Sequence, residues 1–252
     1  MLADRLGPRD PLFAFGERSA HGLGALGTLN GISAELRREL GSLASLSSCP
    51  AGAILFVEEQ MPEEVFILLS GQVKQFVNSS DDRRLILHIA KPGEILGLTS
   101  VLTGSPHRAT AEAFHLCSLA AIRTCDFLKL MGRSAEFSRL VASELGRSYD
   151  HACARLRTVG GAPSNTAKVA RLLLEWCGEG KVTESGIQLH LALRHAEIAE
   201  CIGTSRETVT RILRWFQMRQ IITLRGSILT IADPLALEGC AEFRQPAVEK
   251  GN

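Results

Sequence analysis

Short apolar runs, separated by turn residues, alternate along the first half of the chain. Val65, Ile67 and Leu69 show the period of two that is typical of a half-buried strand, and Ser70-Gly71 and Lys91-Pro92-Gly93 are turn signals. Short strands at roughly ten-residue spacing predict an antiparallel sandwich or barrel. The five predicted strands are Ala53–Val57, Val65–Leu69, Val73–Val77, Leu85–Ile89 and Cys117–Ile122.

Helical periods flank these strands on both sides. Ser33 is a candidate cap for a helix over Ala34 to Leu46, and a longer helix begins near Ser134 and stops at Gly160-Gly161-Ala162-Pro163. This longer helix either packs on the strands or forms a seam between two copies of the chain; its length and abrupt end favour the seam. Its apolar positions are Phe137, Val141, Leu145, Ala152, Leu156 and Val159.

The chain after Pro163 predicts a separate domain. Ser164 or Asn165 caps a helix over Lys168–Cys177, which a polar loop connects to a strand at Ile187–Leu191. Two short helices follow within His195–Leu213. Here Ala199 is small enough for a second helix to cross it, and Gly203 allows the turn between them. The residues predicted to fill the space between these helices are Ile198, Ile202, Val209 and Ile212, with Thr204 or Ser205 as the cap.

The second of these helices separates its faces cleanly, with Val209, Ile212, Leu213 and Phe216 at inward positions. Arg206 and Arg211 can each donate two hydrogen bonds to a guanine, and Glu207 can accept from a cytosine. Glu207 also suits the helix dipole and an ion pair with Arg211. We predict base readout by Arg206, Glu207, Thr210 and Arg211, and phosphate contacts by Ser205, Thr208, Arg214 and Arg225. Arg225, at the tip of a predicted wing over Leu224–Leu229, is equally explained as a solvated turn residue.

Composition limits the alternatives. The 28 basic and 27 acidic residues give a net charge of +1, so a DNA-binding surface must come from local charge arrangement. No apolar run approaches the roughly 18–20 residues of a membrane span, and charges among the first ten residues exclude a signal peptide; a cytoplasmic protein is expected. The seven cysteines form no C-x-x-C pair, which favours free, mostly buried thiols. His88 lacks the His-x-His of a metal-binding cupin, so we expect no enzyme.

The segment Thr204–Leu213 closely resembles the recognition helix of the Crp/Fnr regulators. Gly71 and Lys91–Leu98 are similar to that family's β-roll and its phosphate-binding cassette, and the resemblance covers roughly residues 45–240. It implies an α+β fold: a cyclic-nucleotide-binding-like β-roll (jelly roll), a long dimerisation helix and a C-terminal winged helix-turn-helix. The implied division is a flexible arm at 1–32, the β-roll at 33–133, the dimerisation helix at 134–160, the DNA-binding domain at 161–242 and a tail at 243–252.

The resemblance also implies partners. A homodimer would bind double-stranded DNA at a near-palindromic site, with half-sites about one helical turn apart, and would meet RNA polymerase at promoters. Arg206, Glu207 and Arg211 match the residues with which the catabolite-activator branch reads TGTGA. The anaerobic-regulator branch lacks an arginine at the place of Arg206, which favours TGTGA.

The cassette departs from members that bind cyclic AMP. Those members carry a ribose-binding glutamate after the cassette glycine, where this chain has Leu98, and an Arg-Ser pair where it has Arg108-Ala109. Their adenine-facing Thr-Ser becomes Ala152-Cys153. Since leucine offers the ribose no hydrogen bond, we predict weak or no binding of cyclic AMP. The implied effector pocket is Gly97, Leu98, Thr99, Arg108, Ala109, Ala152 and Cys153.

The signal therefore stays open. No cysteine precedes Cys49, which argues against the iron–sulphur cluster of that branch. A haem-sensing relative would use a histidine or cysteine, and no candidate stands out among His88, His107, His115, His151, Cys117 and Cys153. An unknown effector at the β-roll is one hypothesis; a regulator controlled by abundance or by cysteine oxidation is the other.

Overall fold

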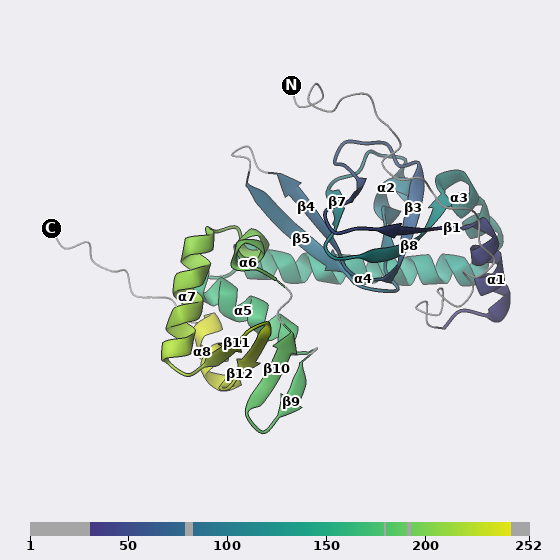
Figure 1. The fold of residues 1–252 in the computed structure, drawn as a ribbon. Coiled ribbons are helices and arrows are strands. Elements are labelled where there is room, and N and C mark those ends of the chain that lie inside the picture. The colour runs from purple at the N-terminus through teal and green to yellow at the C-terminus, as the bar shows by residue number, and fades with distance from the viewer. Residues whose placement is uncertain (1–30, 79–82, 179, 191–192, 243–252) are drawn as a thin grey trace. The chain divides into compact units, whose positions relative to one another are not determined.

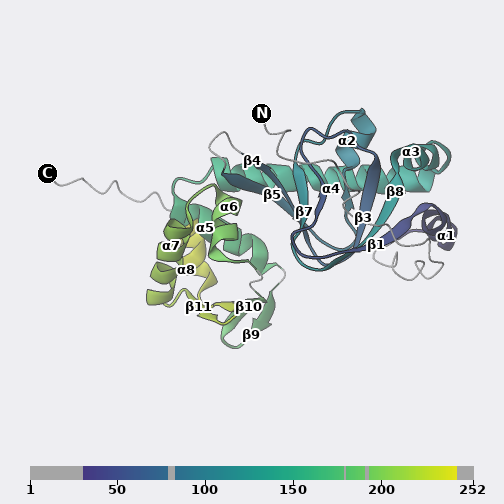
Figure 2. The ribbon, with the colours of Figure 1, turned by 45° about the horizontal axis from the view of Figure 1, so that its top comes forward.

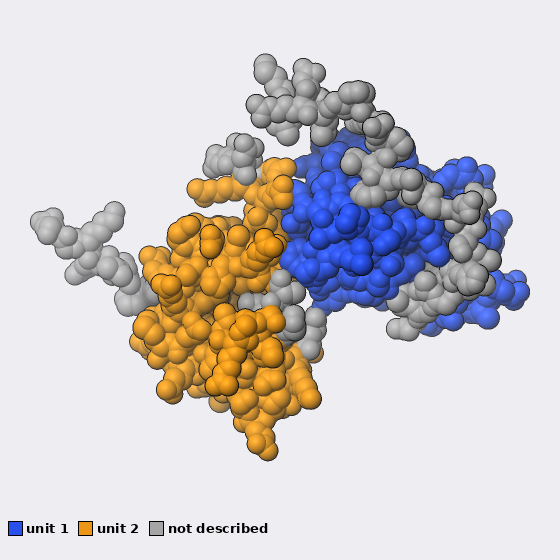
Figure 3. Space-filling model, viewed as in Figure 1, with its two compact units in different colours: residues 1–77, 88–150 blue, residues 78–87, 151–252 orange. Residues whose placement is uncertain are grey.

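The computed structural model describes residues 31–78, 83–178, 180–190 and 193–242 (Figure 1). Two compact units divide the chain, one of residues 1–77 and 88–150 and the other of residues 78–87 and 151–252 (Figure 3). Residues 1–30 of the predicted arm and the predicted tail, 243–252, lie outside the described residues. Along the chain as far as α4, the elements are α1 Ala34–Leu43, β1 Ser45–Cys49, β2 Ile54–Phe56, β3 Glu64–Ser70, β4 Val73–Asn78, β5 Arg84–Ala90, β6 Ile95–Leu96, α2 Leu98–Thr103, β7 Thr110–Ala113, β8 Cys117–Arg123, α3 Thr124–Arg133 and α4 Ala135–Gly160. All of them belong to the first unit except Asn78, the part of β5 up to Leu87 and the last turns of α4.

Two antiparallel four-stranded sheets form the β-roll, in the orders β1-β8-β3-β6 and β2-β7-β4-β5. All five predicted strands are present. The expectation that β3 is half-buried is wrong, because this strand is covered on both faces. Val65 and Ile67 pack against helices, whereas Phe66 and Leu68 pack in the core shared with the second sheet. A strand buried on both sides is a continuous apolar run, as residues 65–69 are.

Helices cover the outer face of the first sheet. Figures 1 and 2 show α1 and α3 side by side, where Arg133 forms an ion pair with Glu39. Ser33 caps α1 as predicted, accepting from the Leu36 backbone N–H. However, α1 ends at Leu43, because residues 45–49 pair with β8. The remaining short elements, among them β6, β7 and α2, carry too few residues to show a period of their own.

The apolar stripe predicted along α4 is buried in the first turns of the helix and partly exposed farther along. Phe137 and Val141 are 0% and 1% exposed, and they pack with Phe127 in the helix-side core of the β-roll. The ordinary packing role therefore holds for the first turns of the helix, and the predicted seam is wrong there. Farther along α4, Tyr149 and Leu156 are 70% and 72% exposed.

The second unit contains a sheet in the order β11-β12-β10-β9 and the helices around it. The last turns of α4 belong to this unit, since Arg155 donates from Nε to the Leu87 carbonyl and from Nη1 to the Cys201 carbonyl. The compact units thus divide inside α4, whereas the predicted domain limit follows its end at Gly160. The other elements are α5 Asn165–Cys177, β9 Lys181–Thr183, β10 Gly186–His190, α6 His195–Ile202, α7 Arg206–Met218, β11 Ile222–Arg225, β12 Ile228–Ile231 and α8 Pro234–Glu242.

Candidate DNA interface and effector cassette

The turn between α6 and α7 has the geometry that its sequence predicts. Gly203 adopts the left-handed conformation, with φ of +69°, and ends α6. The Thr204 backbone N–H then donates to the Ala199 carbonyl over 3.0 Å. Ala199 is only 3% exposed, so its small side chain lies where the two helices meet. A larger residue at 199 or a β-branched one at 203 would disrupt this crossing.

The faces of α7 separate as predicted. Val209, Ile212, Leu213 and Phe216 are buried, and Phe216 is fully inaccessible. Ser205 is the cap, and its Oγ accepts from the Thr208 backbone N–H over 3.2 Å. The inward apolar stripe fixes which side of α7 faces solvent, because side chains three and four residues apart share a face.

Three arginines and one carboxylate lie exposed on the outer side of α7: Arg206, Glu207, Arg211 and Arg214. Hydrogen bonds from its own backbone N–H and from the Ser205 hydroxyl, and the charge of Arg206, lower the pKa of Glu207. This carboxylate is thus a first-turn acid, as predicted. The predicted ion pair with Arg211 is not formed: among the described residues no ion pair joins Glu207 and Arg211, and the groups that lower the pKa of Glu207 lie in the first residues of the helix and its cap.

Thr210 is held inside the helix-turn-helix. Its hydroxyl donates to the Arg206 carbonyl and also lies 2.9 Å from Nδ1 of His195, the first residue of α6. The hydroxyl proton is therefore used inside the domain, so Thr210 has no donor left for a base, whereas its methyl group stays available. His195 was not among the predicted site residues, because a hydrogen bond between two helices leaves no spacing signal in one sequence.

The wing is a two-stranded hairpin. β11 pairs with β12, so that Arg225 lies opposite Ile228 beside the turn at Gly226. Arg225 is exposed. This position suits both a phosphate contact and a solvated turn residue.

The cassette residues lie around α2, and two of them are core residues. Leu98 is 4% exposed and packs with Val65 and Ile67, and Ala109 is 9% exposed. Thr99 and Arg108 are exposed. Gly97 has φ of +82°, and a Cβ there would lie 3.2 Å from the ring of His107. The other predicted pocket residues, Ala152 and Cys153, lie on α4 in the second unit.

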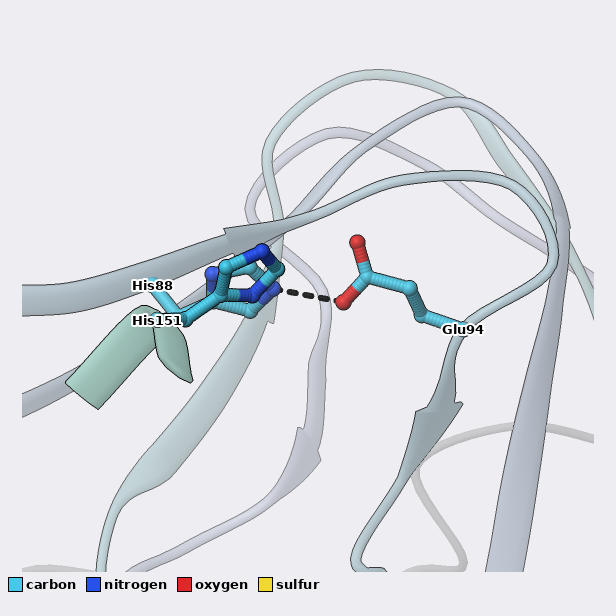
Figure 4. Close-up of side chains that lie close together, drawn as sticks. All are labelled: His88, Glu94 and His151. Carbon is cyan, nitrogen blue, oxygen red and sulfur yellow. Dashed lines mark hydrogen bonds and ion pairs between the residues drawn. The ribbon is translucent and has the colours of Figure 1, made fainter. Parts of the chain in front are cut away.

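Two histidines of the β-roll have partners that the sequence did not predict. His107, 3% exposed, stacks on Phe56 with 3.9 Å between ring centroids, and its burial lowers its pKa. His88 Nε2 lies 2.5 Å from Glu94 Oε2. Figure 4 shows the two side chains facing each other. The other oxygen of Glu94 accepts from the Lys91 backbone N–H, so this carboxylate closes the turn before β6.

Burial makes most of the thiols inert. Cys117 is fully buried, and its Sγ donates to the Gln72 and His115 carbonyls. Burial raises its pKa, and raises the pKa of Cys201 to about 12. The thiolate is the reactive form, so neither residue suits a redox sensor. Cys125 is exposed and Cys153 partly so.

Comparison with known proteins identifies both units. The family model of the cyclic nucleotide-binding domain matches residues 46–134, and that of the Crp-like helix-turn-helix domain matches residues 167–240. The cyclic AMP receptor protein of Thermus thermophilus is 27% identical over 192 residues, covering 76% of this chain and 86% of the relative. The nitrogen fixation regulation protein FixK of Bradyrhizobium diazoefficiens is 28% identical over 221 residues, covering 82% and 86%.

A solved structure agrees on the fold. A CooA mutant from Carboxydothermus hydrogenoformans superimposes with a TM-score of 0.71 at 21% identity, covering 88% of this chain and 97% of that one. Fold and site together define a winged helix-turn-helix protein with a β-roll of the cyclic-nucleotide-binding type. The chain belongs to the Crp/Fnr family: it is a DNA-binding transcription regulator. Among the described residues, no helix is long and apolar enough to cross a membrane.

Proposed function

We propose that this regulator binds a near-palindromic, TGTGA-type DNA site as a homodimer, and that a signal other than cyclic AMP controls it through the β-roll. Arg206 and Arg211 read guanines and Glu207 reads a cytosine. Phosphate contacts come from Ser205, Thr208, Arg214 and Arg225. At promoters, the bound dimer meets RNA polymerase.

The observation that carries the DNA-reading part is the outer face of α7. Arg206 and Arg211 are both exposed, and the buried stripe of the helix lies on its other side. A guanidinium can donate to O6 and N7 of guanine together, because its N–H groups form a rigid planar fork. Thr210, whose hydroxyl proton is used inside the domain, contributes its methyl group to readout, which suits a thymine methyl.

The dimer part is supported by a second stripe on α4. Positions 142, 146, 149, 153 and 156 are spaced by four, three, four and three residues, which is the a/d repeat of a two-helix seam. They carry Ala142, Gly146, Tyr149, Cys153 and Leu156. Tyr149 and Leu156 are among the most exposed large apolar side chains of the described chain. A second copy of α4 would bury both.

The exclusion of cyclic AMP is supported by the packing of the cassette. Leu98 stands where cyclic-AMP-binding members carry a glutamate, and its side chain is part of the helix-side core. Ala109 offers no hydroxyl for a cyclic phosphate. A ribose placed beside Leu98 would lose hydrogen bonds to water without replacing them, and a cyclic phosphate would find Arg108 but no hydroxyl at position 109.

Control by cysteine oxidation is the alternative. One observation favours it: Cys153 lies in the proposed seam, so that two copies would bring their thiols together. Full DNA affinity of the reduced, ligand-free protein, lost on oxidation and kept in Cys153→Ser, would support this alternative. A requirement for cell extract would instead support a separate effector.

The test of the main proposal is selection from a random DNA library by the purified protein, followed by sequencing. We expect an inverted repeat of TGTGA-type half-sites whose centres lie about one helical turn, 10–10.5 base pairs, apart. An ultracentrifugation run of the same complex should give two chains per duplex. Enrichment of a single half-site would contradict the dimer, and an unrelated motif would contradict the assigned readout.

A further inference from the structure

His195 joins the two helices of the helix-turn-helix at the end where α7 begins. Its Nδ1 lies 2.9 Å from Oγ1 of Thr210, and its side chain is partly buried. Thr210 in turn lies one helical turn after Arg206. The contact therefore connects the first residue of α6 with the part of α7 that carries the proposed readout.

The direction of these hydrogen bonds follows from proton counting. The Thr210 hydroxyl has one proton, which it donates to the Arg206 carbonyl over 2.9 Å. Its oxygen must then accept from His195, so the proton of the neutral imidazole lies on Nδ1. The result is a directed chain, from His195 Nδ1–H to the Thr210 hydroxyl to the Arg206 carbonyl.

The surroundings of His195 disfavour the protonated form of its ring. Burial first, and then the positive charges of Arg206 and Arg214 on α7, lower the pKa of His195. On its own helix, Glu197 turns its carboxylate to the Arg194 backbone N–H, over 2.7 Å, rather than to the imidazole.

We propose that His195 is a positioning residue for base readout, which holds the first turn of α7 through Thr210 and so fixes the backbone from which Arg206 reaches a base. The proposal rests on the DNA readout proposed above. Without the imidazole donor, Thr210 is free to rotate away from the Arg206 carbonyl. The helix still forms, because its buried stripe is unchanged, but its first turn loses a defined orientation.

DNA binding should also change the protonation of His195. Phosphates beside Arg206 and Arg214 offset the positive charge that disfavours the imidazolium, so the pKa of His195 rises in the complex. The complex then binds more protons than the free protein. By linkage, the affinity increases as the pH falls, by at most about tenfold per pH unit.

The test compares His195→Ala, His195→Asn, Thr210→Val and the double variant His195→Ala/Thr210→Val. Asparagine places an N–H donor close to the position of Nδ1, so it should restore binding. We measure affinity for the selected site and for random duplex by fluorescence anisotropy, between about pH 6 and pH 8, the range in which histidine titrates. His115→Ala, an exposed histidine of the β-roll, is the matched control.

We expect His195→Ala and Thr210→Val each to weaken specific binding about fivefold, the effect of one net hydrogen bond. The double variant should bind the selected site no more weakly than the weaker-binding of the two single variants. The affinity of every variant for random duplex should stay unchanged. His195→Asn should recover most of the affinity that His195→Ala loses. Both His195 variants should lose the pH dependence that His115→Ala keeps.

Three results would overturn the proposal. Equal losses of affinity on specific and random DNA would make His195 a phosphate contact. Additive losses in the double variant would show that His195 and Thr210 act independently. If His195→Asn binds no better than His195→Ala, the donor role is removed. If wild-type protein selects a site other than a TGTGA type, the proposed readout fails. The His195 variants are then judged on the selected site, so the two failures are distinguished.

Discussion

The recognition helix α7 keeps the polar residues of the family pattern, whereas the cassette around α2 has apolar residues at two of those positions. On α7, Arg206 and Arg211 keep polar side chains in solvent, above a buried stripe that ends at Phe216. In the cassette, Leu98 and Ala109 replace the polar residues that ligand-binding members carry, and both are buried. Both regions resemble the same family; α7 keeps all the polar groups of the proposed contacts, whereas the cassette keeps Arg108 and lacks the other two.

The difference shows what happens to an apolar residue that replaces a polar residue of a binding site. An apolar residue in a half-open site gains free energy by joining the neighbouring core, at roughly 25 cal/mol per Å² of buried apolar surface. Leu98 does so beside Val65 and Ile67. An exposed guanidinium has no such alternative, and its retention in solvent on α7 is consistent with use by a partner.

The largest expected effect belongs to Leu98→Ala. If Leu98 is core, truncation should lower the free energy of unfolding of the β-roll by about 2–5 kcal/mol. Calorimetry is the measurement of choice, because Trp176 and Trp215 both lie in the second unit and their fluorescence would miss the β-roll.

The matched control is Leu116→Ala, since Leu116 is 69% exposed. Its truncation should change the free energy of unfolding by no more than about 0.5 kcal/mol. A similarly small effect at Leu98 would mean that this side chain lines an open pocket, and the contrast with α7 would disappear.

Next in size is Arg206→Ala. Losing a guanidinium that contacts a guanine should weaken specific binding by about 1–3 kcal/mol and relax the preference at one base pair. Footprinting and anisotropy on the selected site measure both. Gln217→Ala, exposed near the other end of α7, is the control and should bind like wild type. An unchanged base preference in Arg206→Ala removes this residue from readout.

A smaller effect concerns the buried histidine of the β-roll. Because burial lowers the pKa of His107, the unfolded chain takes up a proton more readily than the folded one. Stability should therefore fall as the pH drops below about 6.5, by at most about 1.4 kcal/mol per pH unit, until the folded pKa is reached.

His107→Phe keeps a ring against Phe56 but cannot titrate, so its unfolding temperature should depend less on pH in this range than that of wild type. His115→Gln should keep the wild-type slope, because His115 is exposed. Equal slopes in wild type and His107→Phe would show that His107 takes up no proton on unfolding.

Elements with a strong local pattern were predictable from the sequence. The inward stripe of α7, the glycine turn at Gly203 and the Ser33 cap depend on residues within one or two turns of each other. The end of α1 was missed, because pairing of residues 45–49 with β8 outweighs their local preference. The seam on α4 was placed on Phe137 and Val141 because nothing in the pattern says which apolar stripe meets the chain's own sheets.

The same limit applies to the candidate site. The exposure of Arg206 and Arg211 follows from the helical period, so it could be predicted. The bonds of Thr210 to His195 and of Glu94 to His88 join side chains whose distances depend on tertiary structure. Glu207 was assigned to Arg211 by spacing alone, whereas the groups that lower its pKa are its own backbone N–H, the Ser205 hydroxyl and Arg206.

The smallest expected effect is that of cyclic AMP on the stability of the β-roll, where we expect none. This result tests whether the cassette, unlike α7, has lost the contacts of the family pattern. Millimolar cyclic AMP should leave the unfolding temperature of the β-roll unchanged, because Leu98 and Ala109 offer the ribose and the cyclic phosphate nothing to bind. A ligand present at 100 times its dissociation constant would stabilise the folded state by about 2.7 kcal/mol, which calorimetry detects easily. The Thermus thermophilus cyclic AMP receptor protein, run beside this chain, is the positive control. A clear upward shift here would mean that Arg108 and backbone groups suffice for the nucleotide, and that the cassette, like α7, retains its chemistry.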